Sequence, residues 1–438
     1  MKRFFILLIC ILPLLGKAQP KLSLAECVDL LAKNNLLYHQ GSLQAEAAQA
    51  QLRQTRSQIF PQIYITADQS LNLGRSIDQY TNEYIDQLYG YNSISTGFQM
   101  PVYQGGKLQN QTRQGTLLKE SAMENRTAVL NAQTVLLMQG YVNVLATKAL
   151  FEAAEQQVAS SQQQVDKVQK QVEAGTAGNN LLAEIKAQLA NDRYLQVTAL
   201  SNYRTARLAL FQRMNVTPDD NIEFEPLLPK ESITPAAANA TELYENAIKT
   251  FPEIRSAELN RQSYKYLVKS IKALNYPSLN LSTNVRAFYA SSNDNLDYFK
   301  QLNATRNGYI NLGLNIPIMG RWVTRPRVEL AKVQERQAQN TLDITNQQLR
   351  QAIETAVLNL NAMADKHAAA EGQVESLAAA FAVVESKFNA GVSSIFEYTL
   401  SKAKLAQAQG TAIQAKYDYL MQQRLLQYYR QGNWQGVF

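Results

Sequence analysis

The chain has few of the residues that metal, redox and disulfide chemistry require. Among its 438 residues are two cysteines, Cys10 and Cys27, and two histidines, His39 and His367. Cys10 lies in an N-terminal segment that we expect to be removed, so Cys27 remains alone and cannot form an intramolecular disulfide. Neither histidine has other ligand-type residues beside it, and both are expected at solvent-exposed helix positions. The sequence therefore predicts no metal site and no cofactor, and it predicts Cys27 to be a small packing residue of the first helix.

Signatures of catalysis and of nucleic-acid binding are missing as well. Gly105-Gly106-Lys107 lacks the spacing and the Ser or Thr of a phosphate-binding loop and is expected at a strand-to-helix joint. Carboxylates are spread along helical segments, and no pair of them is singled out for acid–base chemistry. Loss of Lys2, Arg3 and Lys17 with the N-terminal segment takes the formal charge from +7 to +4, which is mild for a chain of this length, and the basic residues are scattered. These absences disfavour an enzyme and a nucleic-acid partner.

Long hydrophobic runs are absent beyond the N-terminus. The chain begins with basic residues, an apolar run from Phe4 to Leu15 and the small-residue site Gly16-Lys17-Ala18. This is the pattern of a secretory signal peptide cleaved after Ala18. The apolar run is too short to span a bilayer as a helix, and no run of about 18 apolar residues follows it. Any membrane crossing must therefore be made by β-strands.

What the chain does contain is a repeat of itself. Three pairs of marks keep one offset of 216 positions: Phe60-Pro61 and Tyr276-Pro277, Met100-Pro101-Val102 and Ile316-Pro317-Ile318, and Ala174-Gly175 and Ala390-Gly391. Three marks of different kinds at one offset indicate an internal duplication with no insertion between them. Both copies are therefore predicted to contain the same helices and strands.

Long helices make up most of each copy. Segments rich in Ala, Gln and Leu predict helices over 24–58, 106–172 and 181–214, and over 241–275, 327–387 and 395–429. A helix from 106 to 172 is on the order of 100 Å long, far longer than ordinary globular helices. The last two helices of each copy form a hairpin whose turn carries Gly175 or Gly391, because glycine is favoured just past a helix end.

Each approach to a hairpin turn has a spacing of three and four residues. The second copy has Val374, Leu377, Phe381, Val384 and Phe388, and the first has Val158, Ser161, Val165, Val168 and Val172. An average spacing of 3.5 gives a coiled-coil seam. The two antiparallel hairpins are therefore predicted to pack side by side near their tips.

Four short segments change to the period of two that is typical of β-strands. In 62–73, Ile63 and Ile65 fall on one face, with Asp68 and Asn72 on the other. The same alternation occurs at 94–100, 279–287 and 310–316. The first segment has the length of a tilted membrane crossing, about 9–11 residues.

Four strands cannot close a membrane barrel, since the smallest such barrels have about eight strands and an open edge in lipid is costly. Cyclic association completes the barrel, and three chains would give twelve strands around a lumen. The residues predicted to face that lumen are Asp68, Asn72, Asn280, Asn284, Arg286, Asn311 and Asn315.

The duplication, the proline-bounded strand pairs and the turn motifs Val172-Glu173-Ala174-Gly175 and Phe388-Asn389-Ala390-Gly391 resemble the outer-membrane efflux protein family, the TolC-like channel-tunnels of Gram-negative bacteria. The likeness covers nearly the whole chain after residue 18. It implies a mainly α fold with a small β part, in which a homotrimer forms a periplasmic α-barrel and a twelve-stranded transmembrane β-barrel. It also implies a passive outer-membrane duct for tripartite efflux or type I secretion, coupled through a periplasmic adaptor to an inner-membrane pump of the RND or ABC type.

The resemblance places adaptor docking at the two helical tips. The residues so assigned are Ala174, Gly175, Thr176, Ala390, Gly391 and Val392. A second interpretation, in which Gly175 and Gly391 are only helix caps, stays open beside it. Asn179-Asn180 stand where family members often have an Asp, so gating by charges at the closed end is not carried over.

The predicted organisation is a signal peptide (1–18), a first repeat (19–214), a connector (215–240), a second repeat (241–430) and a C-terminal tail (431–438). The resemblance places the connector in the equatorial region of the helical part. Trp322, just after a strand end, is either an interfacial aromatic or a packing residue. The competing hypotheses are an exported coiled-coil protein, a periplasmic adaptor and, least favoured, an enzyme.

Overall fold

The computed structural model describes residues 21–78, 80–227, 239–292, 296–434 and 437, so the predicted signal peptide lies outside the described residues. The helices are α1 (Leu24–Asn34), α2 (Leu36–Ser57), α3 (Lys107–Glu173), α4 (Asn179–Met214), α5 (Ala240–Thr250), α6 (Pro252–Lys272), the 3₁₀ turn η2 (Ala273–Asn275), α7 (Tyr298–Thr305), α8 (Arg321–Asn389) and α9 (Ile395–Gln431). The strands are β1 (Lys21–Leu22), β2 (Gln62–Asn72), β3 (Arg75–Ile77), β4 (Tyr84–Asp86), β5 (Tyr89–Gln104), β6 (Glu223–Phe224), β7 (Ser278–Ala290) and β8 (Asn307–Asn315).

The chain divides into two compact units, and both copies of the repeat contribute to each. Unit 2 consists of Gly41–Thr127 and Pro252–Gln347 and holds the main sheet with the helices that enter and leave it. Unit 1 consists of the chain up to Gln40, Ala128–Phe251 and the chain from Gln348, and it holds the two helical hairpins. The long helices α3 and α8 contribute to both units.

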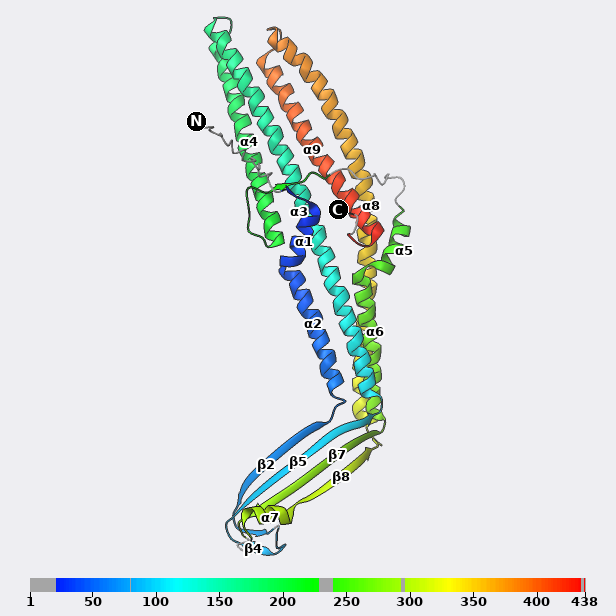
Figure 1. The fold of residues 1–438 in the computed structure, drawn as a ribbon. Coiled ribbons are helices and arrows are strands. Elements are labelled where there is room, and N and C mark those ends of the chain that lie inside the picture. Colours follow the sequence, from blue (N-terminus) through cyan, green and yellow to red (C-terminus); the bar gives the residue numbers. More distant parts are fainter. Residues whose placement is uncertain (1–20, 79, 228–238, 293–295, 435–436, 438) are drawn as a thin grey trace, which may run out of the picture. The chain divides into compact units, whose positions relative to one another are not determined.

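Unit 2 is organised by a curved antiparallel sheet in the order β2-β5-β7-β8 (Figure 1). All four strands join helices at one end of this sheet. The prediction of four strands is confirmed, although β5 does not stop at Pro101. It runs on to Gln104 because a register shift between Pro101 and Tyr103 absorbs the proline, which cannot donate to the ladder.

Glycine permits a close approach at the centre of the sheet. Gly97 of β5 lies between Tyr64 of β2 and Asn284 of β7. A β-carbon at Gly97 would lie 2.3 Å from the Thr283 carbonyl oxygen and 3.0 Å from the Tyr64 hydroxyl. Glycine at this position therefore leaves the space that the Tyr64 ring occupies.

Helix α7 replaces a strand at one edge of the sheet. The pairing of β8 with β7 ends at Arg286, but β7 continues to Ala290. The Gln301 side chain accepts from the Ala290 N–H (2.6 Å) and donates to the Ala290 carbonyl (3.1 Å). One turn later, Thr305 Oγ1 accepts from the Phe288 N–H (2.9 Å) and donates to its carbonyl (2.6 Å). Two side chains of α7 thus satisfy the backbone groups that β8 leaves open.

Unit 1 contains two helical hairpins, α3 with α4 and α8 with α9 (Figure 1). Its core is formed by large fully buried side chains of α3 and α4, namely Leu137, Met138, Tyr141, Leu210, Phe211 and Met214. The Tyr141 hydroxyl donates to the Glu225 carbonyl (2.8 Å), just beyond β6. Strand β6 pairs in parallel with β1, so the start of the described chain is fixed to the connector.

Two predicted helices are interrupted. The segment predicted as one helix over 24–58 breaks at Asn35, whose backbone is extended and whose side chain accepts from the Tyr38 N–H (3.0 Å). The segment over 241–275 breaks at Phe251 because a residue before proline is disfavoured in the helical conformation. Asn35 and Phe251 lie at corresponding positions of the two copies, 216 residues apart. The helical periodicity of the sequence predicted neither break.

Further expectations were wrong in detail. Helix α8 begins at Arg321 rather than 327 and includes Pro326 in its second turn. The segment between the strands predicted over 279–287 and 310–316 contains α7, a helix that was not predicted. His367 is half-buried rather than exposed, because its ring packs 5.8 Å from the Tyr419 ring. His39 is exposed as predicted, and Cys27 is fully buried in α1.

Candidate functional site

The strand residues predicted to face a lumen share one face of the sheet. Opposite residues in an antiparallel pair lie on the same face, and the register pairs Asp68 with Ser93 and Ser93 with Phe288. It also pairs Asn72 with Tyr89. By the same register, all seven predicted residues fall on this polar face: Asp68, Asn72, Asn280, Asn284, Arg286, Asn311 and Asn315.

The other face of the sheet is apolar. Ile65 lies opposite Thr96, and Thr96 lies opposite Val285. This face carries Ile63, Ile65, Leu71, Ile94, Phe98, Leu281, Val285, Ile310, Leu312 and Leu314. The sheet therefore separates a polar from an apolar surface, as the wall of a water-filled membrane barrel does.

The polar face ends in an aromatic cluster. Arg286 donates to the Tyr91 hydroxyl, and its guanidinium lies 5.8 Å from the centre of the Phe288 ring. Tyr91 and Phe288 are themselves in contact, with ring centres 5.6 Å apart. Arg286 is thus held by hydrogen bonding and cation–π contact on the polar face.

Both outer strands of the sheet have an open edge. β2 pairs only with β5 and β8 only with β7 in the part of the chain that the structure describes. Their apolar side chains are highly exposed, including Ile63, Ile65, Ile310 and Leu312. Long open edges of this kind are templates for pairing with another chain.

The two hairpin tips have the same backbone structure. At the first tip, the Gly175 N–H donates to the Val172 carbonyl and the Thr176 N–H to the Gln171 carbonyl, both at 2.9 Å. At the second, Gly391 and Val392 donate to Phe388 (3.0 Å) and Lys387 (2.9 Å). These are Schellman caps, and they need the positive φ of Gly175 (72°) and Gly391 (76°).

The tip residues point to solvent. All six predicted docking residues are exposed: Ala174, Gly175, Thr176, Ala390, Gly391 and Val392. A β-carbon built on either tip glycine would touch nothing within 4 Å. The glycines are therefore required by the cap, and the surface around them is open to a partner.

The tips pack against each other as the seam spacing predicts. Val165 and Val168 of α3 are buried against Ile185 and Leu189 of α4. Phe388 and Ile395 of the second hairpin pack on this cluster. Lys167 also donates to the Asn389 side chain (2.6 Å), which adds a polar contact between the hairpins.

A buried polar network, which sequence reasoning missed, crosses the same seam. Lys402 of α9 donates to the Ser161 hydroxyl of α3 (2.7 Å), and that hydroxyl donates to the Asp192 carboxylate of α4. Gln188 also donates to Asp192, at 2.8 Å. Lys402, Ser161 and Asp192 are only 4%, 2% and 3% exposed. One clue was present, since Ser161 is the polar residue among the valines of the first seam.

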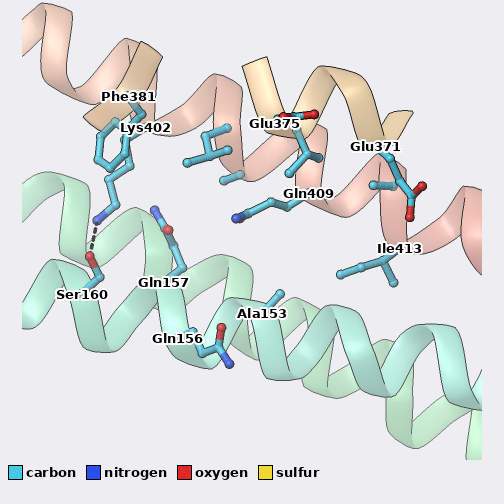
Figure 2. Close-up of a pocket in the computed structure, with 14 residues that line it drawn as sticks. Ala153, Gln156, Gln157, Ser160, Glu371, Glu375, Phe381, Lys402, Gln409 and Ile413 are labelled. Atoms are coloured by element: carbon cyan, nitrogen blue, oxygen red, sulfur yellow. Dashed lines mark hydrogen bonds between the residues drawn. The ribbon is translucent and has the colours of Figure 1, made fainter. Parts of the chain in front are cut away.

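Burial governs the electrostatics of this network. Burial lowers the pKa of Lys402 from its usual value, while the negative charges of Asp192 and Glu385 act in the opposite direction. Figure 2 shows Lys402 at one end of a cavity of about 620 Å³ between the hairpins. Gln156 and Gln157 of α3 and Glu371 and Glu375 of α8 line this cavity. Apolar side chains, among them Phe381 and Ile413, complete the lining, so the cavity is a gap of mixed polarity between helices beside the buried lysine.

The two tryptophans have different environments. Trp434 is buried and stacks on Tyr428, with ring centres 4.2 Å apart, so it is a packing residue. Trp322, on the first turn of α8, is exposed. The packing interpretation therefore does not apply to Trp322.

Comparison with known proteins identifies the family. A sequence profile described as outer membrane efflux protein matches residues 28–216 and again residues 243–429. The chain belongs to the outer membrane efflux protein family. It accordingly has the architecture of that family, with a transmembrane β-barrel part in the outer membrane and a large periplasmic part.

Individual relatives are distant. Outer membrane protein TolC of Escherichia coli strain K12 is 25% identical over 186 residues, which are 40% of this chain and 38% of TolC. The chain therefore matches well under half the length of this relative. Protein CyaE of Bordetella pertussis is 20% identical over 403 residues, 91% of this chain and 80% of CyaE. The crystal structure of VceC from Vibrio cholerae has the same fold, with a TM-score of 0.78 at 15% identity over 93% of this chain and 96% of VceC.

Proposed function

We propose that three copies of this chain form a channel-tunnel that provides a passive exit duct through the outer membrane. The observation that carries the proposal is a four-stranded sheet with one polar face, one apolar face and two open edges. Joining β8 of one copy to β2 of the next satisfies both edges and closes twelve strands around the polar face. Asp68, Asn72 and Arg286 are then among the residues that line the lumen.

The duct itself has no source of energy, so it requires a pump. We infer that a periplasmic adaptor docks on the exposed tips around Thr176 and Val392 and links the trimer to an inner-membrane pump of the RND or ABC type. Two equivalent caps of small residues support this role, because a partner backbone can approach them closely. Tripartite efflux and type I secretion are the processes that such an assembly serves.

Strand closure is tested by disulfide cross-linking between copies. Ile65→Cys on β2 is combined in turn with Ile310→Cys, Leu312→Cys or Leu314→Cys on β8, all on the apolar face. One of these pairs should give covalent trimers, because three links close the ring. The matched control is the pair Ile65→Cys and Val285→Cys. Val285 lies two strands from Ile65 in the same sheet, and the two residues are about 10 Å apart. Absence of covalent trimers from every β2–β8 pair would reject the closed barrel.

The tip role is tested by substitutions that spare the caps. Thr176→Trp and Val392→Trp add bulk at exposed positions without changing the left-handed glycines. We expect efflux to fall while trimers persist, and Lys170→Trp, at an exposed position one turn before Ala174, to have less effect. Unchanged efflux in both tip variants would reject adaptor docking at the tips and would mean that Gly175 and Gly391 act only as helix caps. Replacing Gly175 itself is less informative, because a side chain there strains the backbone by about 1–2 kcal/mol.

Surface labelling separates the channel from a periplasmic coiled-coil protein or adaptor. Gln87→Cys and Lys300→Cys place thiols in the two segments at the end of the sheet that carries α7. Burial raises the pKa of the Cys27 thiol to about 12, so the native cysteine gives a low background. Labelling of both positions in intact cells supports the channel. Labelling only after the outer membrane is permeabilised would support a periplasmic protein instead.

A further inference from the structure

A groove of about 800 Å³ in unit 2 lies where the sheet meets its helices. It is lined by residues of two segments, the end of α6 with the following turn and the first turns of α8. Its side chains combine two aromatic rings, Tyr276 and Trp322, with four cationic groups, Lys272, Arg321, Arg325 and Lys332. Neither the fold nor the proposed duct requires this combination.

The groove has an excess of positive charge. Glu329 is its one carboxylate among the lining residues, and this group accepts from Arg325 Nε at 3.2 Å. No described carboxylate forms an ion pair with Lys272, Arg321 or Lys332. Three cations gathered without counter-charges repel one another, so an anion bound among them would be stabilised. Arginine in particular presents paired donors that match phosphate oxygens.

The groove lies at one boundary of the apolar face. Tyr276 comes two residues before β7, and Trp322 is the second residue of α8, after β8 has ended. The apolar positions of β8 continue through Ile316 and Ile318, which are 58% and 90% exposed, to Trp322 at 76%. A groove that joins an apolar stripe to cations and an indole ring has the composition of a membrane–water interface.

We propose that this groove binds the phosphate headgroup of an anionic phospholipid in the periplasmic leaflet of the outer membrane. Arg321, Lys272 and Lys332 contact the phosphate, while Trp322 and the apolar stripe lie against the upper acyl chains. The assignment rests on the proposed orientation in which the apolar face of the sheet contacts lipid. Free inorganic phosphate shares the headgroup chemistry but not the contact with the apolar stripe, so lipid is the occupant that both features fit.

The test uses Trp322 as its own probe. The chain has two tryptophans, so Trp434→Phe leaves Trp322 alone in the full-length protein. This variant is reconstituted in phosphatidylcholine vesicles that contain brominated phosphatidylglycerol or, in a parallel sample, brominated phosphatidylcholine. Bromine quenches indole fluorescence only on contact. Should Trp434→Phe fail to fold, the difference between the wild type and Trp322→Phe gives the same quantity.

We expect brominated phosphatidylglycerol to reach the same quenching of Trp322 as brominated phosphatidylcholine at a mole fraction that is lower by a factor of about five or more. One interfacial cation alone strengthens the binding of an anionic lipid by about that factor. The triple change Lys272→Gln, Arg321→Gln and Lys332→Gln should abolish the preference and retain the quenching by phosphatidylcholine. A control with the same loss of charge in unit 1, Lys366→Gln, Lys387→Gln and Lys404→Gln, should keep the preference.

Four outcomes would overturn the lipid site. Equal quenching by both lipids would mean that the groove does not select an anionic headgroup. A preference that survives the triple Gln change would place the selectivity elsewhere, and a preference abolished by millimolar inorganic phosphate would make the groove a phosphate site. No quenching of Trp322 by either lipid would contradict the outward orientation itself, and cross-linking between β2 and β8 would show independently whether the barrel had formed.

Discussion

The buried network of Lys402, Ser161 and Asp192 gives the sharpest prediction about the helical hairpins. Replacing one charged member leaves the other buried without its counter-charge, which costs about 3–5 kcal/mol in typical cases. Asp192 keeps its bonds from Ser161 and Gln188 in Lys402→Met, so we place this variant at the lower end, about 3 kcal/mol. Asp192→Leu should cost a similar amount, because the buried ammonium then has only the Ser160 and Ser161 hydroxyls as hydrogen-bond acceptors and Glu385 as its remaining nearby negative charge. The double variant Lys402→Met with Asp192→Leu should lie within about 1 kcal/mol of the wild type, since it removes both desolvated charges.

The assay is thermal unfolding of the detergent-extracted protein followed by circular dichroism, arranged as a double-mutant cycle. For a domain of 150–250 residues, about 1 kcal/mol corresponds to roughly 2–4 °C. Each single variant should therefore lose roughly 6–12 °C, and the double variant should regain most of the loss. A double variant whose loss equals the sum of the two single losses would show that the charges are not coupled, and the reasoning would fail. Ser161→Ala is a useful companion, because it removes the bridging hydroxyl and leaves both charges in place.

Three further results are expected. Because burial lowers the pKa of Lys402, protonation favours the unfolded chain, and wild-type stability should rise as the pH increases from neutral towards the usual lysine value of 10.5; a titrated unfolding series should show a smaller rise in Lys402→Met. Leu281→Arg on the apolar face should impair membrane insertion by about 2–4 kcal/mol, whereas its neighbour Ser282→Arg on the polar face should insert normally, as measured by the yield of folded protein in outer-membrane fractions; equal yields would mean that the faces are reversed. Gly97→Ala should destabilise the sheet by about 1–3 kcal/mol in a denaturant titration, because its β-carbon meets a strand carbonyl and the Tyr64 hydroxyl, and an unchanged midpoint would contradict the close approach.

The features that could be predicted from the sequence are those with a local period. Alternation placed Asp68 and Asn72 on one face, and the register of four strands joins them to Asn284 and Arg286. A spacing of 3.5 predicted that the hairpins pack together near their tips, and Gly175 marks the helix end where the backbone turns left-handed. In each case neighbouring residues carry the signal, so one sequence suffices.

The features that could not be predicted depend on partners far apart in the chain. Lys402 reads as an ordinary polar residue of a helix, and only its contact with Ser161, 241 positions away, shows that it is buried. Helix α7 has only eight residues inside a polar segment. Its structural role depends on the hydrogen bond between Gln301 and the backbone of β7, which the sequence does not indicate. The groove at Trp322 likewise requires α6 and α8 to lie together.

The substitution of α7 for a strand bears on the order of assembly. Gln301 and Thr305 form hydrogen bonds with the backbone groups of the part of β7 that extends beyond β8. This part of β7 therefore has no open backbone groups with which another chain could pair. Two strands of the sheet keep an unpaired edge, β2 with 11 residues and β8 with 9. They belong to opposite sides of the same sheet, so in the proposed trimer β8 of each subunit pairs with β2 of the next. Unwanted pairing of the part of β7 that extends beyond β8 is thereby disfavoured, and in the proposed trimer the last assembly step joins the free β2 edge of the first subunit to the free β8 edge of the third.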